Sequence, residues 1–288
     1  MSVLLRIKIL GHLLLPPIVT RWLARTPPSP PEIIGPPPSF SLEYLPAGWS
    51  TLQERKDEIK GWNVDRLVNI ETAKWKAFCE NCRGTGPLGF SHEHTDQTQV
   101  RDVSFHNIHM TYAYVIALAA RKKTHFSILD WGGALGHYYQ LAQALMPDVT
   151  IDYHCKEVPA MAEAGKRLNP EVHWYADNSC LDRTYDLVMN NSSLQYIRDW
   201  RGTLAGLARS ANEYLFLARM PILDKGPSSA AIQRVYETEM ILHLFSREDV
   251  LAVVEAEGFR VVRDFVGERF SIHNAPEQCE VRGWLFKR

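Results

Sequence analysis

A glycine-rich turn and an acidic residue further along the chain are the features of this sequence that could do chemistry. Gly132, Gly133 and Gly136 follow an apolar run that ends at Asp130, and their lack of side chains lets a ligand approach the backbone closely. Glu157 follows the next β-like run, at the spacing expected of a carboxylate that binds ribose hydroxyls. These features predict a site for a ribose-bearing ligand. The alternative is a tight turn with a capping carboxylate.

The spacing within this turn distinguishes between nucleotide cofactors. A dinucleotide-binding turn reads GxGxxG, whereas this turn reads GGALG after Trp131. S-adenosylmethionine (SAM) has no pyrophosphate to place at a helix N-terminus, but its methionine part needs room and a polar group for the amino end. Asp130 can supply that group. The turn therefore favours SAM over NAD, and an NAD-dependent oxidoreductase is the less favoured alternative.

If SAM donates a methyl group to a hydroxyl, the protein must align donor and acceptor and supply a base. His137 is the candidate base, because the dipole at a helix N-terminus favours the neutral imidazole. The alternative is a solvent-facing residue at the helix start, and His154, Tyr138 and Tyr139 are rivals near the same sheet edge. No acidic pair follows the run at 185–190, so we expect no metal in the reaction.

Short β-like runs alternate with helical stretches from residue 126 onwards, which predicts an α/β fold with helices on both faces of an open, doubly wound sheet. Strands are predicted at 126–130, 149–154, 172–175, 185–190, 213–218, 259–266 and 281–286. Helices are predicted at about 137–146, 159–168, 199–210 and 246–257. Helical periodicity at 52–82 and at about 108–121 predicts a cap in front of the sheet.

Several segments together resemble a known family. They are ILDWGGALGHYYQ at 128–140, KEVP at 156–159, YDLVMNNSSLQYI at 185–197, ARMPIL at 218–223, IQRVY at 232–236 and LFSREDVL at 244–251. From about residue 40 to the end, the chain resembles class I SAM-dependent methyltransferases encoded among polysaccharide and lipopolysaccharide biosynthesis genes. The resemblance implies a Rossmann-like sheet of about seven strands behind a helical cap. It also implies O-methylation of a sugar hydroxyl on a glycan or lipid-linked glycan.

Carried over residue by residue, the resemblance implies that Asp130, Gly132, Gly133 and Gly136 surround the methionine part of SAM, and that Glu157 holds the ribose. The remaining positions are Asp177 and Asn178 at the adenine, Asn190 and Asn191 along the cofactor, and Gln195 and Tyr196 facing the acceptor. Tyr196 is the second candidate catalytic residue beside His137. Ala134 departs from the Gly that is commoner in the middle of the turn. A protein that binds SAM, or acts as a scaffold, without catalysing methyl transfer is therefore the alternative function.

Composition limits the partners. Lys plus Arg total 32 and Asp plus Glu 33, which leaves no basic field, so we expect no nucleic-acid partner. Five cysteines favour a reducing compartment over a disulfide framework. A zinc site can be drawn from Cys79, Cys82, His92, His94, His106 and His109. The CxxC ends a helical stretch, however, where small apolar residues are ordinary packing.

Four regions are expected along the chain: an apolar basic segment at 1–25, a Pro-rich linker at 26–38, the helical cap at 39–122 and the methyltransferase domain at 123–288. The uncharged run at 9–19 is too short for a bilayer span of about 20 residues. We predict that residues 1–25 lie at an anionic membrane surface, the alternative being a helix packed on the protein itself. The protein is then cytoplasmic and peripheral on the cytoplasmic face of the membrane.

Overall fold

The computed structural model describes residues 41–45, 48–49, 61–90, 102–223, 225–235, 238–270 and 272–288. The predicted membrane-surface segment and the Pro-rich linker lie outside these residues, as does the first part of the predicted helix at 52–82. Residues from Ser39 to Arg288 form one compact unit. Among the described residues, no helix combines the length and apolar character needed to cross a bilayer.

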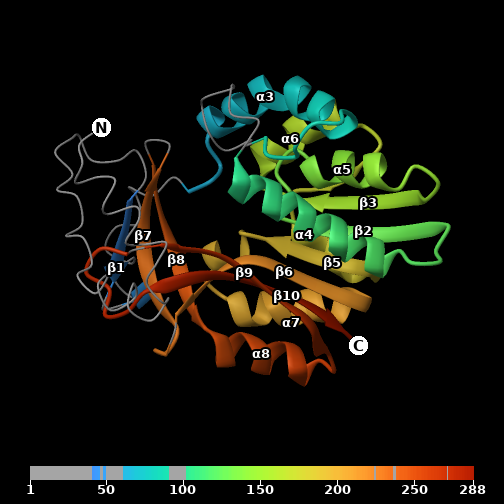
Figure 1. Cartoon of the computed structure of the whole chain (residues 1–288). Coiled ribbons are helices and arrows are strands. Elements are labelled where there is room, and N and C mark those ends of the chain that lie inside the picture. Colours follow the sequence, from blue (N-terminus) through green and yellow to red (C-terminus); the bar gives the residue numbers. More distant parts are fainter. Residues whose placement is uncertain are drawn as a thin grey trace, which may run out of the picture. The chain divides into compact units, whose positions relative to one another are not determined.

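Seven strands form the main sheet in the order β4-β3-β2-β5-β6-β10-β9 (Figure 1). They are β2 (His125–Trp131), β3 (Thr150–Lys156), β4 (His173–Tyr175), β5 (Tyr185–Asn191), β6 (Ala211–Leu223), β9 (Arg260–Phe270) and β10 (Cys279–Lys287). The first five are parallel, and β10 runs antiparallel to both of its neighbours. Strand order reverses at β2, which makes the end of β2 the point where ligands bind in such sheets. The prediction of a doubly wound, Rossmann-like sheet is confirmed.

Helices cover both faces of the main sheet, as predicted. One face carries α3 (Asp65–Arg83), α4 (Val103–Ala119), α5 (His137–Leu145) and α6 (Pro159–Leu168), and the other carries α7 (Trp200–Ser210) and α8 (Arg247–Ala256) (Figure 1). Each face has its own apolar core, because alternate residues of each buried strand point to opposite faces. The helix α4 begins five residues earlier than predicted, since the side chain of Asp102 caps it by accepting a hydrogen bond from the Phe105 backbone N–H.

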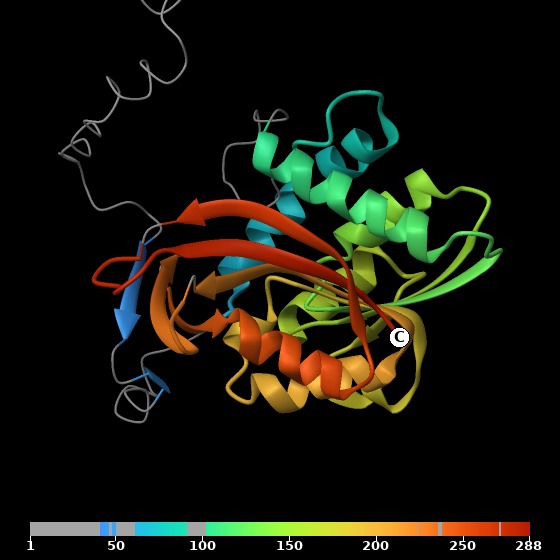
Figure 2. The same ribbon diagram turned by 60° about the horizontal axis from the view of Figure 1, so that its bottom comes forward.

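Three further strands, which the sequence pattern did not predict, extend the sheet. They are β1 (Ser41–Leu45), β7 (Ser229–Val235) and β8 (Thr238–Ser246), paired antiparallel in the order β1-β7-β8. The extension joins the end of β6, where Ile222 pairs with Phe245 of β8, and Figure 2 shows β9 and β10 reaching toward it as a long curved pair. Strand β1 lies within the region 39–122, for which only helices were predicted. Its partner β7 is far away in the sequence, since Ser41 pairs with Arg234, so no local pattern reveals the pairing.

Candidate cofactor site

The carboxyl ends of β2, β3 and β5 meet at one edge of the sheet, because these strands are parallel neighbours. Asp130 lies next to the last residue of β2, and Glu157 immediately follows β3. The glycine turn connects β2 to α5 between them. The structure therefore brings the predicted turn and the two predicted carboxylates together at the point where the strand order reverses.

Close packing explains the glycines of the turn. Gly132 has φ of +86°, and its backbone N–H donates to the Lys156 carbonyl at 2.8 Å. A Cβ atom on Gly132 would collide with the Ser193 side chain, and one on Gly133 would collide with the Asp130 carboxylate. Ala134 has φ of +52°, so it adopts the left-handed conformation that favours glycine. Having Ala134 at this position, where Gly is commoner, therefore strains the backbone.

The Glu157 carboxylate is bound to the turn that it faces. Its Oε1 accepts a hydrogen bond from the Ala134 backbone N–H at 3.0 Å, and its Oε2 accepts one from the Val158 backbone N–H at 2.7 Å. Burial raises the pKa of Glu157, and these two hydrogen bonds oppose that shift. A carboxylate has about four lone-pair positions, so two of them are left to accept hydrogen bonds from vicinal hydroxyls.

Asp130 is completely buried and only half satisfied. Its Oδ2 accepts a hydrogen bond from the Tyr153 hydroxyl at 2.8 Å, whereas its Oδ1 has no hydrogen-bond partner among the residues that the structure describes. Burial raises the pKa of Asp130 to about 7, the Tyr153 hydrogen bond lowers it, and the nearby Glu157 charge raises it further. An unmatched carboxylate oxygen inside a protein is costly, so the position suits a cationic or hydrogen-bonding ligand group.

Asp177 and Asn178 follow β4 and are exposed, at the edge where adenine contacts were expected. The Asp177 side chain caps a 3-10 turn at 178–182: its Oδ1 accepts from the Ser179 backbone N–H at 3.0 Å and from the Ser179 hydroxyl at 2.6 Å. These hydrogen bonds lower the pKa of Asp177. The contacts account for the local turn, and the role of both residues at an adenine stays a prediction.

Asn190 is buried and all its polar atoms are engaged. Its Nδ2 donates to the Trp131 carbonyl at 2.9 Å and to the Ser193 hydroxyl at 2.6 Å, and its Oδ1 accepts from the Leu194 backbone N–H at 3.1 Å. Asn190 therefore holds the loop after β5 against the loop after β2. Asn191 is half-buried, and its Nδ2 donates to the Tyr138 hydroxyl. Of the two asparagines, Asn191 is the better placed to contact a ligand.

The candidate base His137 is not solvent-facing. The residue is 2% exposed, and its ring lies edge-on to Trp75 and Phe78 of α3, with ring centroids 5.2 and 4.7 Å away. The rival His154 lies on the opposite face of the sheet from Tyr138 and Tyr139. It packs against the Tyr185 ring at 5.0 Å, whereas the two tyrosines belong to the core beneath α3 and α4. The structure thus separates residues that the sequence placed at one edge.

Tyr196 and Gln195 lie in a short turn after β5, at residues 194–196. The Tyr196 hydroxyl donates to Gln233 Oε1 of β7 at 2.7 Å, and its ring contacts Trp62 edge-on at 5.1 Å. Gln195 is buried and its Nε2 donates to the Ser192 hydroxyl at 2.9 Å. Tyr196 is therefore held by the strand extension through β7, and its role at an acceptor stays a prediction.

Sequence reasoning missed two residues that organise the site. The Tyr153 hydroxyl holds Asp130, and the Ser193 hydroxyl fills the space beside Gly132 while donating to the Trp131 carbonyl at 2.9 Å. Tyr153 lies on β3 and could have been found by strand alternation, since it shares a face with Cys155 under the turn. Nothing in the local sequence points to Ser193.

The alternative of a zinc site involved several cysteines and histidines. Those that the structure describes make packing contacts and hydrogen bonds elsewhere. Cys82 packs in the apolar core, and burial raises the pKa of its thiol to about 12. The His106 Nδ1 accepts a hydrogen bond from the Leu88 backbone N–H at 3.1 Å, and the His109 Nδ1 lies 2.6 Å from the Leu88 carbonyl. His92 and His94 lie outside the described residues.

The chain matches no protein-family model and no curated protein sequence. Solved methyltransferase structures are similar to it at low identity. A magnesium protoporphyrin IX methyltransferase from Synechocystis PCC 6803, with bound SAH, is 12% identical, covering 78% of this chain and 100% of that chain, with a TM-score of 0.46. An amino pentose methyltransferase from Micromonospora echinaspora, with bound SAM, is 15% identical over 65% of this chain and 93% of its own, with a TM-score of 0.44. At such low sequence identities and TM-scores, the similarity is one of backbone fold alone.

Proposed function

We propose that the chain is a SAM-dependent methyltransferase, with its cofactor at the edge formed by Asp130, the glycine turn and Glu157. The observation that carries the proposal is the hydrogen bond from the Ala134 backbone N–H to Glu157 Oε1, which ties the ribose-binding carboxylate to the glycine turn at the reversal of strand order. Ligands bind at this point of doubly wound sheets.

The residues present fit SAM. When bound, SAM supplies an electrophilic methyl group to an acceptor nucleophile. The free lone pairs of Glu157 accept hydrogen bonds from the two ribose hydroxyls. The buried Asp130 Oδ1 has no hydrogen-bond partner among the described residues. It can therefore accept a hydrogen bond from the methionine ammonium and balance its positive charge. The turn then holds the methionine part while α5 begins behind it.

For the acceptor, we propose a sugar hydroxyl on a glycan or lipid-linked glycan, which undergoes O-methylation. Support comes from the resemblance of the chain at 185–197 and 218–223. The residue proposed to face this acceptor is Tyr196, whose hydroxyl is oriented by its hydrogen bond to Gln233. The burial of His137 favours a packing role for that residue over a base, and Tyr196 is the more accessible of the two proposed catalytic residues.

Calorimetric titration with SAM tests the cofactor site before any acceptor is known. We expect wild-type affinity near micromolar, which corresponds to about −8 kcal/mol. Asp130→Asn and Glu157→Gln each remove a charged partner, so each should weaken binding about 10- to 100-fold. Asp186→Asn is the matched control, because Asp186 is a hydrogen-bonded carboxylate near the amino end of β5, the opposite edge of the sheet. Absence of SAM binding by folded wild-type protein would refute the proposal.

A SAM-binding protein without catalytic activity is the second candidate. The enclosure of His137 by Trp75 and Phe78, together with the strained Ala134, favours it. Incubation with methyl-labelled SAM and a panel of glycans and lipid-linked glycans separates the two functions. Label transferred to a glycan and lost in Tyr196→Phe supports the enzyme. Tight SAM binding with no label transfer to any glycan supports the inactive protein.

A further inference from the structure

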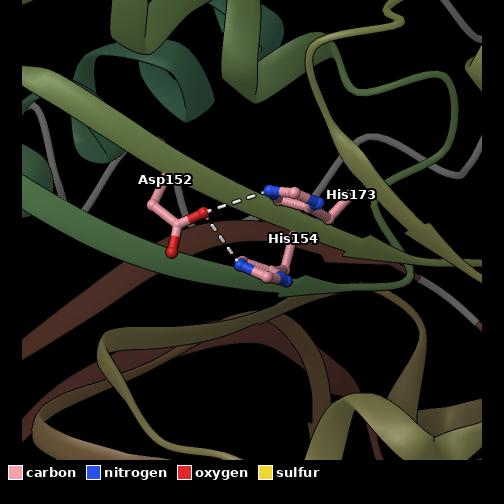
Figure 3. A group of neighbouring side chains, drawn as sticks. All are labelled: Asp152, His154 and His173. Carbon is pink, nitrogen blue, oxygen red and sulfur yellow. Dashed lines mark hydrogen bonds and ion pairs between the residues drawn. The ribbon is translucent and has the colours of Figure 1, made fainter.

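A cluster of metal-binding side chains lies on the sheet face opposite His137. Asp152 and His154 are two residues apart on β3 and share a face, and His173 on β4 is the register partner of His154. Figure 3 shows the two imidazoles side by side, with the Asp152 carboxylate pointing toward both. Their ring centroids are 4.5 Å apart and their planes are inclined by 21°.

Two of the separations between the three ligand atoms are close to those between neighbouring ligands of a tetrahedral ion. Asp152 Oδ1 lies 3.0 Å from His154 Nε2 and 3.4 Å from His173 Nε2. All three atoms lie within 4.8 Å of one another. Zinc–nitrogen bonds of about 2.0–2.1 Å give a tetrahedron with edges of about 3.3 Å. The two measured edges are therefore close to those of a zinc site.

Neighbouring groups orient the two ligands on β3. The Tyr175 hydroxyl lies 2.9 Å from His154 Nδ1, the ring nitrogen that faces away from the cluster. Arg183 donates to Asp152 Oδ2 at 3.3 Å, which holds the carboxylate and leaves Oδ1 directed at the histidines. Outer hydrogen bonds of this kind fix the ligands of metal sites. The Arg183 charge opposes cation binding, so the site should be weaker than one without it.

We propose that Asp152, His154 and His173 bind a divalent first-row transition-metal ion of the zinc type, with three protein ligands and an open fourth position. Two imidazoles favour such an ion over magnesium or calcium, which prefer oxygen ligands. The side chains of His173 and Asp152 are 60% and 44% exposed, so an ion can enter from solvent and retain a water ligand. The three ligands are distinct from the residues of the proposed SAM site.

A metal ion bound here would cross-link β3 and β4 at the edge of the sheet. Strand β4 has only three residues, and the ion would join it to β3 through side chains as well as backbone. Tyr175 continues the connection, because its carbonyl accepts a hydrogen bond from the Glu157 backbone N–H at 3.0 Å. Occupancy should therefore stabilise the folded edge that carries Glu157.

Titration of the full chain with Zn²⁺ in a non-chelating buffer tests the site. Wild-type protein should bind one equivalent that His173→Ala loses, with an affinity decrease of more than about 100-fold, since loss of an outer partner alone costs about 10- to 100-fold. Tyr175→Phe should weaken binding about 10-fold. His125→Ala removes another exposed histidine, at the start of β2, and should bind as wild type does. His173 is chosen over the buried His154 because its replacement spares the core.

Two further measurements report on geometry and stability. Co²⁺ should give the visible absorption of a tetrahedral site in the wild type and in His125→Ala, and not in His173→Ala. Saturating Zn²⁺ should raise the Tm by about 5 °C in the same two proteins, because the ion binds only the folded state. Equal Zn²⁺ affinity, stoichiometry and Tm shift in wild type and His173→Ala would overturn the proposal.

Discussion

Asp130 is a residue whose charge depends on what binds beside it. Its carboxyl group lies within the sheet, has one hydrogen bond from Tyr153, and has a pKa raised to about 7 by burial. An ordinary aspartate loses its proton near pH 4. Between these values the folded protein holds a proton that the unfolded chain has released, so the contribution of Asp130 to stability falls as pH rises from about 4 to about 7.

A pH dependence of SAM binding follows from this. The ammonium of SAM favours the ionised carboxylate, so we expect affinity to rise with pH up to about 7 and then level off, with proton release on binding near pH 6. Titration calorimetry in buffers of different ionisation enthalpy measures the released proton. Asp130→Asn should release none. Tyr153→Phe removes a hydrogen bond that lowers the pKa of Asp130, so its profile should shift to higher pH. A flat profile in the wild type contradicts the assignment.

Ala134 carries a backbone strain that a smaller residue relieves. A left-handed conformation costs an ordinary residue about 1 kcal/mol, and glycine adopts it freely. Ala134→Gly should therefore raise the free energy of unfolding by up to about 1 kcal/mol, while Ala134→Val should lower it. Urea denaturation of the three proteins measures the difference. If Ala134→Gly is the least stable of the three, the Ala134 conformation is not strained as described.

At the scale of elements, the loops after β2 and β5 interlock. Ser193 occupies the space next to Gly132, and Asn190 joins the Trp131 carbonyl to the Leu194 backbone N–H. A change in the conformation of either loop would therefore displace the other. The same contact that shapes the glycine turn thus positions Asn191 and the residues of the turn at 194–196.

Gly132→Ala should disrupt both loops. The added methyl group meets Ser193 and the backbone already has positive φ, so we expect a loss of about 2–4 kcal/mol in unfolding free energy. Adding Ser193→Gly to the Gly132→Ala protein should recover the part of the lost stability that comes from the collision with Ser193. The part that comes from the positive φ should remain lost. Gly206→Ala is the control. Gly206 lies inside α7, where an added Cβ would make only ordinary contact with the Leu181 side chain, so this substitution should stabilise the protein slightly. Thermal denaturation compares the four proteins, and equal Tm values for wild type and Gly132→Ala would contradict the interlock.

The elements that the sequence predicted are those with strong local patterns. The seven main strands and α5 to α8 follow from periodicity, and the turn and Glu157 follow from spacing along the chain. The burial of His137 could not be predicted, because it depends on α3 packing over the start of α5. Strand β7 begins with Ser and two Ala residues, which have weak strand preference, so its role in the extension is also hidden locally.

For the whole molecule, association with a membrane is the remaining expectation. The basic residues of segment 1–25 are Arg6, Lys8, Arg21 and Arg25. The full chain should co-sediment with vesicles containing phosphatidylserine, and replacement of these four residues by Gln should weaken binding by about 1 kcal/mol per cation. Neutral phosphatidylcholine vesicles provide the control. Unchanged sedimentation of the substituted chain would favour a segment packed on the protein itself.

The length of β6 has a consequence for how the molecule opens. This strand has 13 residues; its first part pairs with β5 in the main sheet, its last residues pair with β8 in the extension, and β10 follows it along most of its length. One continuous strand thus supplies hydrogen bonds to both parts. The extension cannot separate without exposing the backbone of the main sheet, so amide protons in the two parts should exchange with solvent as a single cooperative unit.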